Sequence, residues 1–350
     1  MSQRPHHGPN PYVGPRAFQP GERLYGRDRE VMELVDLLIA ERIVLLYSPS
    51  GAGKTSLLQA ALLPQMEKEN FVVLPPMRLT LALPGSGITG ANAPNRYVLS
   101  LLLSLEEALP PEEQMPVSAL ANMTLGEYLD RRQASRPERE DTVLLFDQFE
   151  EILTIDPGNR AAREELLAQV GAALRDRSRW AVLAMREEFV AGLDPYLPLL
   201  PTRLATRYRL ELLGLPGAQE AMRQPAADSG VAFSSDAASK LALDLAAVRV
   251  QQPDGTVSVL PGDHVEPVQL QVVCHRLWER LSPAQVEIGL DELEEVGDVD
   301  TALREYYADR VAYAAARSGA PERAIRDWVE SRLITEQGIR GQVLQRVGQS

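Results

Sequence analysis

The chain has 350 residues, a formal net charge of −13 and a pI near 5.0. Such acidity argues against nucleic-acid binding over the whole surface, although it is compatible with a local basic patch. One cysteine, Cys274, allows no internal disulfide and fits a reducing compartment. No apolar run reaches the roughly 18 residues of a membrane span, and the polar, proline-rich start is not a signal peptide. We expect a soluble, cytoplasmic protein of about two domains.

Up to about residue 212, predicted helices and strands alternate along the chain. The first 22 residues are rich in proline and glycine and predict an extended arm. Apolar spacing predicts a helix over 27–41, a short apolar run predicts a strand over 43–46, and a helix over 56–63 is expected to end at Pro64. Further strands are expected at 71–74, 142–146, 180–185 and 208–212. Further helices are expected at 97–109, at 125–132 and after Asp156-Pro157, which predicts an N-cap and a first helical position.

This alternation predicts an α/β fold with a mostly parallel sheet covered by helices on both faces. Beyond Gly214 the pattern becomes helical and rich in alanine and leucine, over 217–247 and 267–318, with a polar loop or small hairpin between. The chain is therefore expected to have four parts. These are an arm at 1–22, an α/β domain at 23–214, a helical domain at 215–318 and a final segment at 319–350.

The stretch from Ile43 to Leu58 is the most specific signal in the sequence, because a strand, a small-residue loop, Gly-Lys-Thr and a helix follow in order. The loop leaves backbone N–H groups free to point at phosphate oxygens, and the helix N-terminus adds partial positive charge. Lys54 would reach the terminal phosphates, and the Thr55 hydroxyl would ligate Mg²⁺. This is a P-loop with one departure: Ser48 stands where the pattern has glycine, and serine is small enough for the turn. The alternative, a glycine-rich turn without a ligand, is the weaker interpretation because every part has its required context.

A partner carboxylate is predicted at the end of another strand. The apolar run that ends at Phe146 places Asp147 at the C-terminal end of its strand, where α/β sheets bind ligands. Asp147 would act through a water on Mg²⁺, and either Glu150 or Glu151 could orient or activate the attacking water. The alternative is a strand end with solvated acids, which the upstream P-loop makes less favoured.

Arginines provide the third element of the predicted site. Arg186 follows the strand at 180–185, where its guanidinium could sense or neutralise the γ-phosphate. The alternative is a surface arginine paired with Glu187 or Glu188. The arginine-rich segment at 203–209 could include a finger that acts on another subunit, but a solvated strand edge is favoured.

Several motifs occur in a fixed order along nearly the whole chain, from about residue 10 to 345. They are Asn10-Pro-Tyr-Val-Gly-Pro-Arg-Ala-Phe, Leu24-Tyr-Gly-Arg-Asp-Arg-Glu30, Ser48-Pro-Ser-Gly-Ala-Gly-Lys-Thr-Ser, Phe146-Asp-Gln-Phe-Glu-Glu, Ala184-Met-Arg-Glu-Glu-Phe, Leu213-Gly-Leu-Pro216, Val265-Glu-Pro-Val-Gln-Leu-Gln-Val-Val-Cys274 and Leu333-Ile-Thr-Glu-Gln-Gly-Ile-Arg-Gly. This set resembles the bacterial STAND NTPases, which are related to AAA+ and NACHT ATPases. The similarity is greatest to the novel STAND group, which is often fused to WD repeats.

The resemblance implies a P-loop NTPase domain, a helical lid domain and the start of a winged helix over 328–344. It also implies which residues bind ATP or ADP. The implied nucleotide-binding residues are Tyr25, Gly26, Arg27, Ser50, Gly51, Ala52, Gly53, Lys54, Thr55, Ser56 and Pro216. Among them, the segment from Tyr25 to Arg27 would lie near the adenine, and Pro216 would close over the base.

The resemblance assigns catalytic roles as well. Thr55 and Asp147 would hold Mg²⁺, and Arg186 would be the first sensor. Glu150 lies nearest to the catalytic position of NACHT-type ATPases, with Glu151 beside it. Gln148 stands where AAA+ proteins usually carry a catalytic glutamate, so slow hydrolysis is expected.

Proteins of this class are switches, so the resemblance implies a signalling function in stress or antiphage response. ADP would keep the chain closed, and exchange for ATP would open it and allow homo-oligomers to form. Because the sequence ends at Ser350, sensor or effector domains are expected on a missing C-terminal part or on another chain. No membrane or nucleic-acid partner is expected. Two alternatives remain open: an AAA+-like motor or loader that acts on protein or DNA, and an ADP-locked scaffold that does not hydrolyse ATP.

Overall fold

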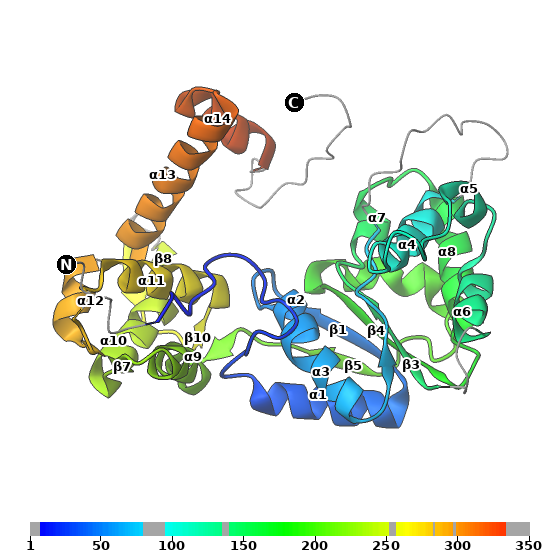
Figure 1. Ribbon diagram of the computed structural model, residues 1–350, viewed down its shortest axis with the longest axis horizontal. Coiled ribbons are helices and arrows are strands. Elements are labelled where there is room, and N and C mark those ends of the chain that lie inside the picture. Colours follow the sequence, from blue (N-terminus) through cyan, green and yellow to red (C-terminus); the bar gives the residue numbers. More distant parts are fainter. Residues whose placement is uncertain are drawn as a thin grey trace. The chain divides into compact units, whose positions relative to one another are not determined.

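The computed structural model describes residues 8–79, 95–134, 140–251, 257–282, 284–296 and 299–333. The chain forms two compact units (Figure 1). One consists of Ala17–Leu212 and is called the α/β unit here; the other consists of Met1–Arg16 with Leu213–Ser350 and is called the helical unit. The chain therefore passes from one unit to the other twice, after Arg16 and after Leu212.

A five-stranded parallel sheet forms the centre of the α/β unit, in the order β2-β3-β4-β1-β5. The strands are β1 (Ile43–Ser48), β2 (Val72–Val73), β3 (Thr142–Phe146), β4 (Arg179–Arg186) and β5 (Arg207–Arg209). All five strands were predicted from sequence, and for β1, β3 and β4 the signal was a short apolar run, which is typical of strands buried on both faces. β4 lies between β1 and β3, so the P-loop strand and the strand before Asp147 are not neighbours.

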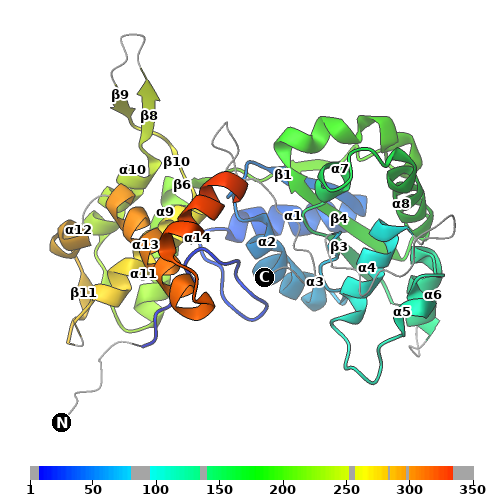
Figure 2. The same cartoon turned by 90° about the horizontal axis from the view of Figure 1, so that it is seen from above.

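Helices cover both faces of this sheet, as Figure 2 shows. Val44 and Leu46 of β1 point to the face covered by the first helices, whereas Ile43 and Leu45 point to the opposite face. The first face is covered by α1 (Asp28–Glu41), α2 (Lys54–Ser56), the π-helix η1 (Leu57–Leu62) and α3 (Leu63–Lys68). The opposite face is covered by α4 (Arg96–Glu106), α5 (Val117–Leu120), α6 (Leu125–Ala134), α7 (Glu151–Thr154), α8 (Arg160–Ala173) and the 3₁₀ segment η2 (Glu187–Leu199). The predicted α/β class is confirmed.

The sequence predictions are wrong at two helix ends. The helix expected to stop at Pro64 continues to Lys68, because a π-helical turn precedes the proline and the amide of Leu63 bonds the carbonyl of Leu58. This wider turn provides room for a residue that lacks an N–H and would otherwise clash with the preceding turn. The helix expected to open at Asp156-Pro157 begins at Arg160 instead, because Asn159 is the N-cap and its side chain accepts a bond from the amide of Ala162.

The described residues of the helical unit are mostly helical, and three pairs of short strands lie among the helices. Its helices are α9 (Leu215–Asp228), α10 (Ser235–Ala246), α11 (Pro267–Arg280), α12 (Leu290–Val296), α13 (Val299–Ser318), α14 (Glu322–Trp328) and the π-helix η3 (Val329–Leu333). Its strand pairs are β6 (Leu213–Gly214) with β10 (His264–Val265), β7 (Ala232–Phe233) with β11 (Glu287–Ile288), and β8 (Val248–Gln251) with β9 (Val257–Leu260). The last pair is antiparallel, which confirms the predicted hairpin. The expected winged helix extends beyond residue 333, outside the described residues, and stays a prediction.

The beginning of the chain packs against the helical unit. Tyr12 is only 2% exposed, its ring lies edge-on to Trp278 at 6.1 Å, and its hydroxyl donates to the carbonyl of Met222 at 2.5 Å. The amide of Val13 donates to the buried side chain of Gln271 at 3.0 Å, and the Asn10 amide group donates to the carbonyl of His275 at 3.1 Å. Residues 8–16 are thus an anchored part of the helical unit, although the sequence signal there was only for an extended arm.

Candidate nucleotide site

The P-loop lies at the carboxyl end of β1 and leads directly into α2. Gly51 and Gly53 have φ angles of 84° and 92°, in the left-handed region that glycine enters without a steric penalty. Gly53 is the N-cap of the helix that starts at Lys54. The loop from Ser50 to Gly53 and the first turn with Thr55 and Ser56 therefore have the backbone shape that exposes amide donors to a phosphate group.

Ser48, the departure from the usual motif, is the last residue of β1 and is fully buried. Its backbone does not have a positive φ, so a glycine is not required there. Its hydroxyl donates to the carbonyl of Pro49 at 2.8 Å and accepts a bond from Nζ of Lys54 at 2.7 Å. The serine therefore holds the P-loop lysine in place through a contact that glycine could not provide.

Asp147 and Thr55 form the second part of the site. Oγ1 of Thr55 lies 3.0 Å and 3.2 Å from the two carboxylate oxygens of Asp147. The amide of Gln148 donates to the same carboxylate at 3.0 Å, and the side chain is almost completely buried. In the described part of the chain, no three acidic, histidine or cysteine side chains gather as a metal cage. A hydroxyl beside one carboxylate fits Mg²⁺, which is usually held by one or two protein oxygens and completed by phosphates and water.

Glu150 and Arg186 form an ion pair at the adjacent strand end. Nε of Arg186 lies 3.3 Å from one carboxylate oxygen of Glu150, and the amide of Arg186 donates to the other at 3.2 Å. Both side chains are largely buried, with 15% and 4% of their surface exposed. Glu188, which the sequence offered as a surface partner for Arg186, is farther away at 3.8 Å. In register, Arg186 is the Cα partner of Ser48, so this pair lies beside the P-loop strand.

Burial and charge together set the protonation of these groups. Burial raises the pKa of Asp147, an effect opposed by the Thr55 hydrogen bond and by the charge of Arg78. Burial also raises the pKa of Glu150, against hydrogen bonding to its own amide and the charges of Lys54 and Arg186. Burial lowers the pKa of Lys54, against the charges of Glu150 and Asp147. Each charged form is thus disfavoured by desolvation and supported by its neighbours.

The turn after β3 brings two further predicted residues close to the site. Gln148 has a φ of 55°, an uncommon value for a residue other than glycine. The amide of Phe149 bonds the carbonyl of Ala184 on β4 at 2.8 Å, which fixes the turn against the central strand. Glu151 is buried and begins α7. The turn thus presents Glu150, and not Glu151, to Arg186.

Arg27 has a contact that the sequence did not predict. Its guanidinium donates to the carbonyl of Ala52 in the P-loop at 3.1 Å and to the carbonyl of Glu211 at 2.9 Å, and it pairs with Glu30 at 2.8 Å. The side chain is almost completely buried, so the P-loop backbone is joined to the segment after β5. The adjacent Gly26 has a φ of 75°, and Tyr25 lies under the guanidinium of Arg23.

The remaining predicted residues lie at the edge of the sheet or in the other unit. Arg203, Arg207 and Arg209 are exposed, and the latter two belong to the edge strand β5. Arg209 pairs with Glu187 at 2.9 Å and also with Glu211. Pro216 is exposed in the first turn of α9, in the helical unit, so its proposed closure over the base stays a prediction.

One charged residue near the site was missed from the sequence. Arg78 follows the bridge between Met77 and Phe146, and its positive charge lowers the pKa of Asp147. Its backbone is held by Ser100, whose hydroxyl donates to the carbonyl of Arg78 at 3.0 Å. The short strand β2 carried little sequence signal for a site, which is why an arginine just beyond it was not singled out.

Comparisons with known proteins agree with this fold. The Walker-type ATPase of Pyrococcus abyssi has 15% identity and a TM-score of 0.53, over 90% of this chain and 80% of that chain. The ORC2 protein of Aeropyrum pernix, solved in ADPNP and ADP complexes, has 15% identity and a TM-score of 0.51, over 93% of this chain and 84% of that chain. At such identities these likenesses show the fold alone.

No curated protein sequence matches the chain significantly. In the described residues, no helix has the length and apolar character needed to cross a membrane. The family described as Novel STAND NTPase 1 matches residues 11–348. Since this match covers almost the whole chain, the protein belongs to the novel STAND NTPase 1 family of P-loop NTPases.

Proposed function

We propose that the chain is an ATP- and ADP-binding signalling switch that hydrolyses ATP slowly with Mg²⁺. Exchange of ADP for ATP opens it and permits homo-oligomers to form, in stress or antiphage response. The observation that carries this proposal is the contact of Thr55 with both oxygens of Asp147, next to a P-loop whose lysine is already positioned. Membership of the STAND family supports nucleotide binding. The switching function is our own proposal beyond that.

The residues of the site would share the work of binding. Mg²⁺, when bound, neutralises charge on the phosphates and orients them. Thr55 would ligate the ion and Asp147 would hold its water shell, since both groups offer oxygen ligands at one point. Lys54 would exchange its bond to Ser48 for a phosphate oxygen. The amides from Ser50 to Gly53 would bind the remaining phosphate oxygens.

Slow hydrolysis would follow from the engagement of Glu150. A carboxylate that orients water must have a free oxygen, but both oxygens of Glu150 are within bonding distance of Arg186. A γ-phosphate would compete for the guanidinium of Arg186 and so release Glu150. Arg186 would therefore make the release of Glu150 depend on the γ-phosphate. When hydrolysis removes that phosphate, the pair of Arg186 and Glu150 would form again and the switch would be reset.

The first test is the nucleotide content of the purified protein. We expect denaturation to release near-stoichiometric ADP, and we expect Lys54→Ala to abolish this binding because the lysine alone supplies a charge inside the loop. Lys68→Ala is the matched control, since Lys68 is exposed and bonds only Gln65 among the described residues. Unchanged nucleotide binding in Lys54→Ala would refute the P-loop assignment. An empty site with rapid, repeated hydrolysis would refute the switch and favour a motor.

A further inference from the structure

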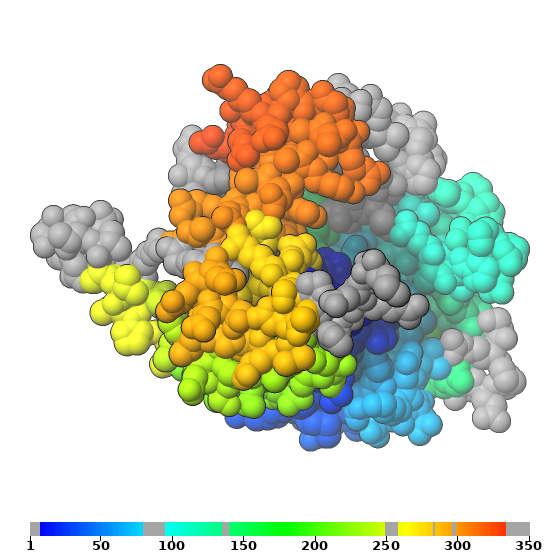
Figure 3. Space-filling model, turned by 60° about the vertical axis from the view of Figure 1, so that its left-hand side comes forward, coloured from blue at the N-terminus to red at the C-terminus, as the bar shows by residue number. Residues whose placement is uncertain are grey.

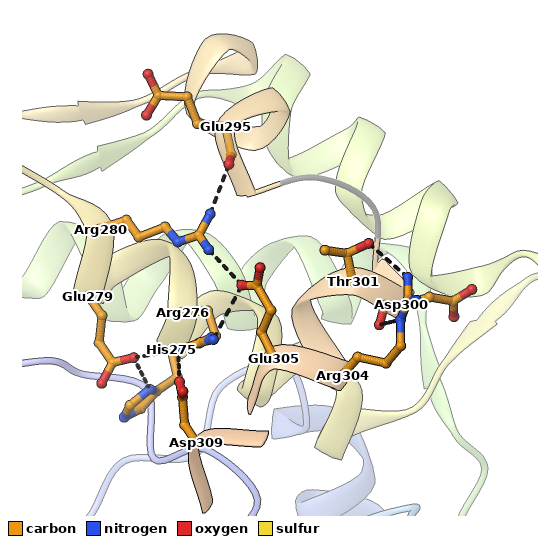
Figure 4. A network of polar contacts seen from close by, with 10 residues as sticks. All are labelled: His275, Arg276, Glu279, Arg280, Glu295, Asp300, Thr301, Arg304, Glu305 and Asp309. Atoms are coloured by element: carbon orange, nitrogen blue, oxygen red, sulfur yellow. Dashed lines mark hydrogen bonds and ion pairs between the residues drawn. The ribbon is translucent and has the colours of Figure 1, made fainter. Parts of the chain in front are cut away.

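The long helix α13 has two sides that differ in charge. The side that faces α11 carries carboxylates, and these pair with arginines of α11. Figure 4 shows Arg276 and Arg280 of α11 reaching the carboxylates of α13. Glu305 accepts from Arg276 at 3.3 Å and from Arg280 at 2.6 Å, and Asp309 pairs with Arg276. The carboxylates in the middle of α13 are therefore neutralised within the helical unit.

The adjacent stripe of α13 carries arginines and tyrosines in alternation. Tyr306, Arg310, Tyr313 and Arg317 recur at intervals of four, three and four residues, which places them along one side of the helix. We call these four residues the arginine–tyrosine stripe. The guanidinium of Arg310 lies 5.3 Å from the ring of Tyr306 and 5.4 Å from that of Tyr313, and Arg317 lies 5.7 Å from Tyr313. Such distances are typical of cation–π contacts, which keep the arginines extended along the helix.

Within the helical unit this surface is prominent, and it is packed against a neighbouring helix at its base. Figure 3 shows α13 and α14 as an orange-to-red ridge above the neighbouring helices. Tyr306 at the base lies against the ring of His275, with centroids 6.4 Å apart, whereas Tyr313 farther along is 53% exposed. On α14, Arg326 lies 5.3 Å from the ring of Tyr307, and Trp328 is 49% exposed. Exposed tyrosine, tryptophan and arginine are the residues that dominate the energetics of protein interfaces.

The charges on this surface indicate what would cover it. Arg310 and Arg317 have no ion pair with any carboxylate of the described residues, and Arg317 donates to the Tyr313 hydroxyl at 2.9 Å instead. Nearby Asp309 is taken by Arg276, and Glu322 is taken by Arg326 at 3.2 Å. The stripe is thus a cationic and aromatic surface on a chain whose net charge is −13. A nucleic acid would be repelled by that net charge over most of the molecule.

We propose that the arginine–tyrosine stripe of α13 is a docking surface for an acidic segment of another protein. The carboxylates of that segment bind Arg310 and Arg317, and its apolar side chains pack on the exposed ring of Tyr313. Arginine suits this role because its fork binds carboxylates in pairs while its face remains stacked on tyrosine. This inference concerns a surface outside the nucleotide site and does not depend on the proposed function.

The test is a selection of peptides from a random displayed library against the full chain. Peptides of about ten residues suffice, because in extended form they span the roughly 30 Å of a twenty-residue helix. We expect enrichment of sequences that combine glutamate or aspartate with aromatic or apolar residues. Enrichment of neutral or basic sequences, or of none that depends on the stripe, would overturn the proposal.

Variants then locate the binding of a selected peptide by fluorescence anisotropy. The double variant Arg310→Gln/Arg317→Gln and the variant Tyr313→Ala should each weaken binding by about tenfold or more, as interface hot spots do. The matched control is Arg304→Gln, which removes the same charge from an exposed arginine of α13 that bonds Asp300 and Thr301 instead. Equal affinity in the stripe variants and the control would refute the proposal. A labelled single-stranded oligonucleotide that binds more tightly than the peptide, and through the same stripe, would assign the surface to nucleic acid instead.

Discussion

At the scale of single residues, the pairing of Glu150 with Arg186 predicts the pH dependence of hydrolysis. Glu150 must be ionised to orient water, and burial raises its pKa above the ordinary value of 4.5. We therefore expect kcat/KM, which reports the pKa of the nucleotide-free protein, to fall as the pH decreases, with an apparent pKa above that ordinary value. Arg186 lowers this pKa through its positive charge, so Arg186→Gln should move the acid limb of the kcat/KM profile to higher pH.

Two comparisons make this prediction specific. Arg209→Gln removes an exposed arginine that pairs with Glu187, and it should leave the limb in place. Glu150→Gln should slow hydrolysis while ATP stays bound, and Glu151→Gln should have the smaller effect. If Glu151→Gln slows hydrolysis more than Glu150→Gln does, the base is Glu151. The pH dependence predicted from Glu150 would then be wrong.

The serine before the P-loop predicts a change in nucleotide affinity. Ser48 accepts a hydrogen bond from Lys54, and we propose that the lysine exchanges this bond for one to a phosphate oxygen. A hydrogen bond of this kind contributes about 1 kcal/mol, so Ser48→Ala should tighten ATP binding by about two- to fivefold. Ser48→Gly should give the same gain but lower the free energy of unfolding by about 0.5–1 kcal/mol, because glycine weakens the end of β1. Calorimetric titration of each variant measures the affinity, and weaker binding in Ser48→Ala would show that the hydroxyl helps to hold the nucleotide.

At the scale of elements, Arg27 joins the P-loop to the end of the α/β unit. Its guanidinium bonds the carbonyls of Ala52 and Glu211, two segments that are 159 residues apart by numbering. Arg27→Gln should lower the free energy of unfolding by about 2–4 kcal/mol, since it leaves the buried carbonyl of Ala52 without a charged donor. It should also weaken ATP and ADP binding equally, because a loosened loop affects both.

The neighbouring arginine of the same helix is the control for that change. Arg29 pairs with Glu33 on the surface, and its side chain is 84% exposed. Arg29→Gln should change stability by less than about 0.5 kcal/mol and leave nucleotide binding unaltered. Urea unfolding and titration of both nucleotides distinguish the variants. A selective loss of ATP binding in Arg27→Gln would place this residue at the γ-phosphate and contradict its role as a clamp.

The elements themselves were largely predictable because their signals are local. Thr142 to Phe146 is an apolar run that ends at a charged residue, and the strand has those same bounds. The P-loop and Asp147 were likewise predictable, because a strand end and a glycine-rich turn fix where these side chains emerge. Pro64 misled the prediction because a π-helical turn depends on how the helix packs against the sheet, which periodicity does not record.

Contacts between distant parts of the chain were not predictable in this way. The sequence offered only Glu187 or Glu188, its neighbours in the chain, as partners for Arg186, but the structure pairs it most closely with Glu150, which follows the neighbouring strand β3. The clamp of Arg27 and the position of Arg78 have the same origin. Each of these contacts depends on the order of the strands in the sheet. No single sequence motif indicated that β4 lies between β1 and β3.

At the scale of the whole molecule, the beginning of the chain belongs to the helical unit although the next residues belong to the α/β unit. Tyr12 bonds Met222, which is 210 residues away, and Phe18 donates its amide to the Ser56 hydroxyl at 3.2 Å, one residue after Thr55 of the P-loop. Residues 8–16 are therefore a strap on the helical unit that continues directly into a contact with the nucleotide site. Because the chain crosses between the units at two points, the strap is a second covalent connection beside the one after Leu212.

This arrangement predicts which part of the chain a mutation in the strap destabilises. Tyr12→Phe removes one buried hydrogen bond to the carbonyl of Met222 and keeps the ring against Trp278. It should lower the stability of the helical unit by about 1–3 kcal/mol, the usual effect of leaving a buried polar group without its partner. Hydrogen exchange should become faster in α9 and α11, whereas the strands of the parallel sheet should keep their protection.

The control is a tyrosine of the same unit with an exposed hydroxyl. Tyr313→Phe removes a hydroxyl that bonds only Arg317 among the described residues, so exchange in α9 and α11 should stay unchanged. If Tyr12→Phe also behaved like this control, the hydroxyl of Tyr12 would contribute nothing to holding the strap. If it instead accelerated exchange throughout the parallel sheet, the two units would unfold as one, and the strap would stabilise the whole chain rather than the unit on which Tyr12 lies.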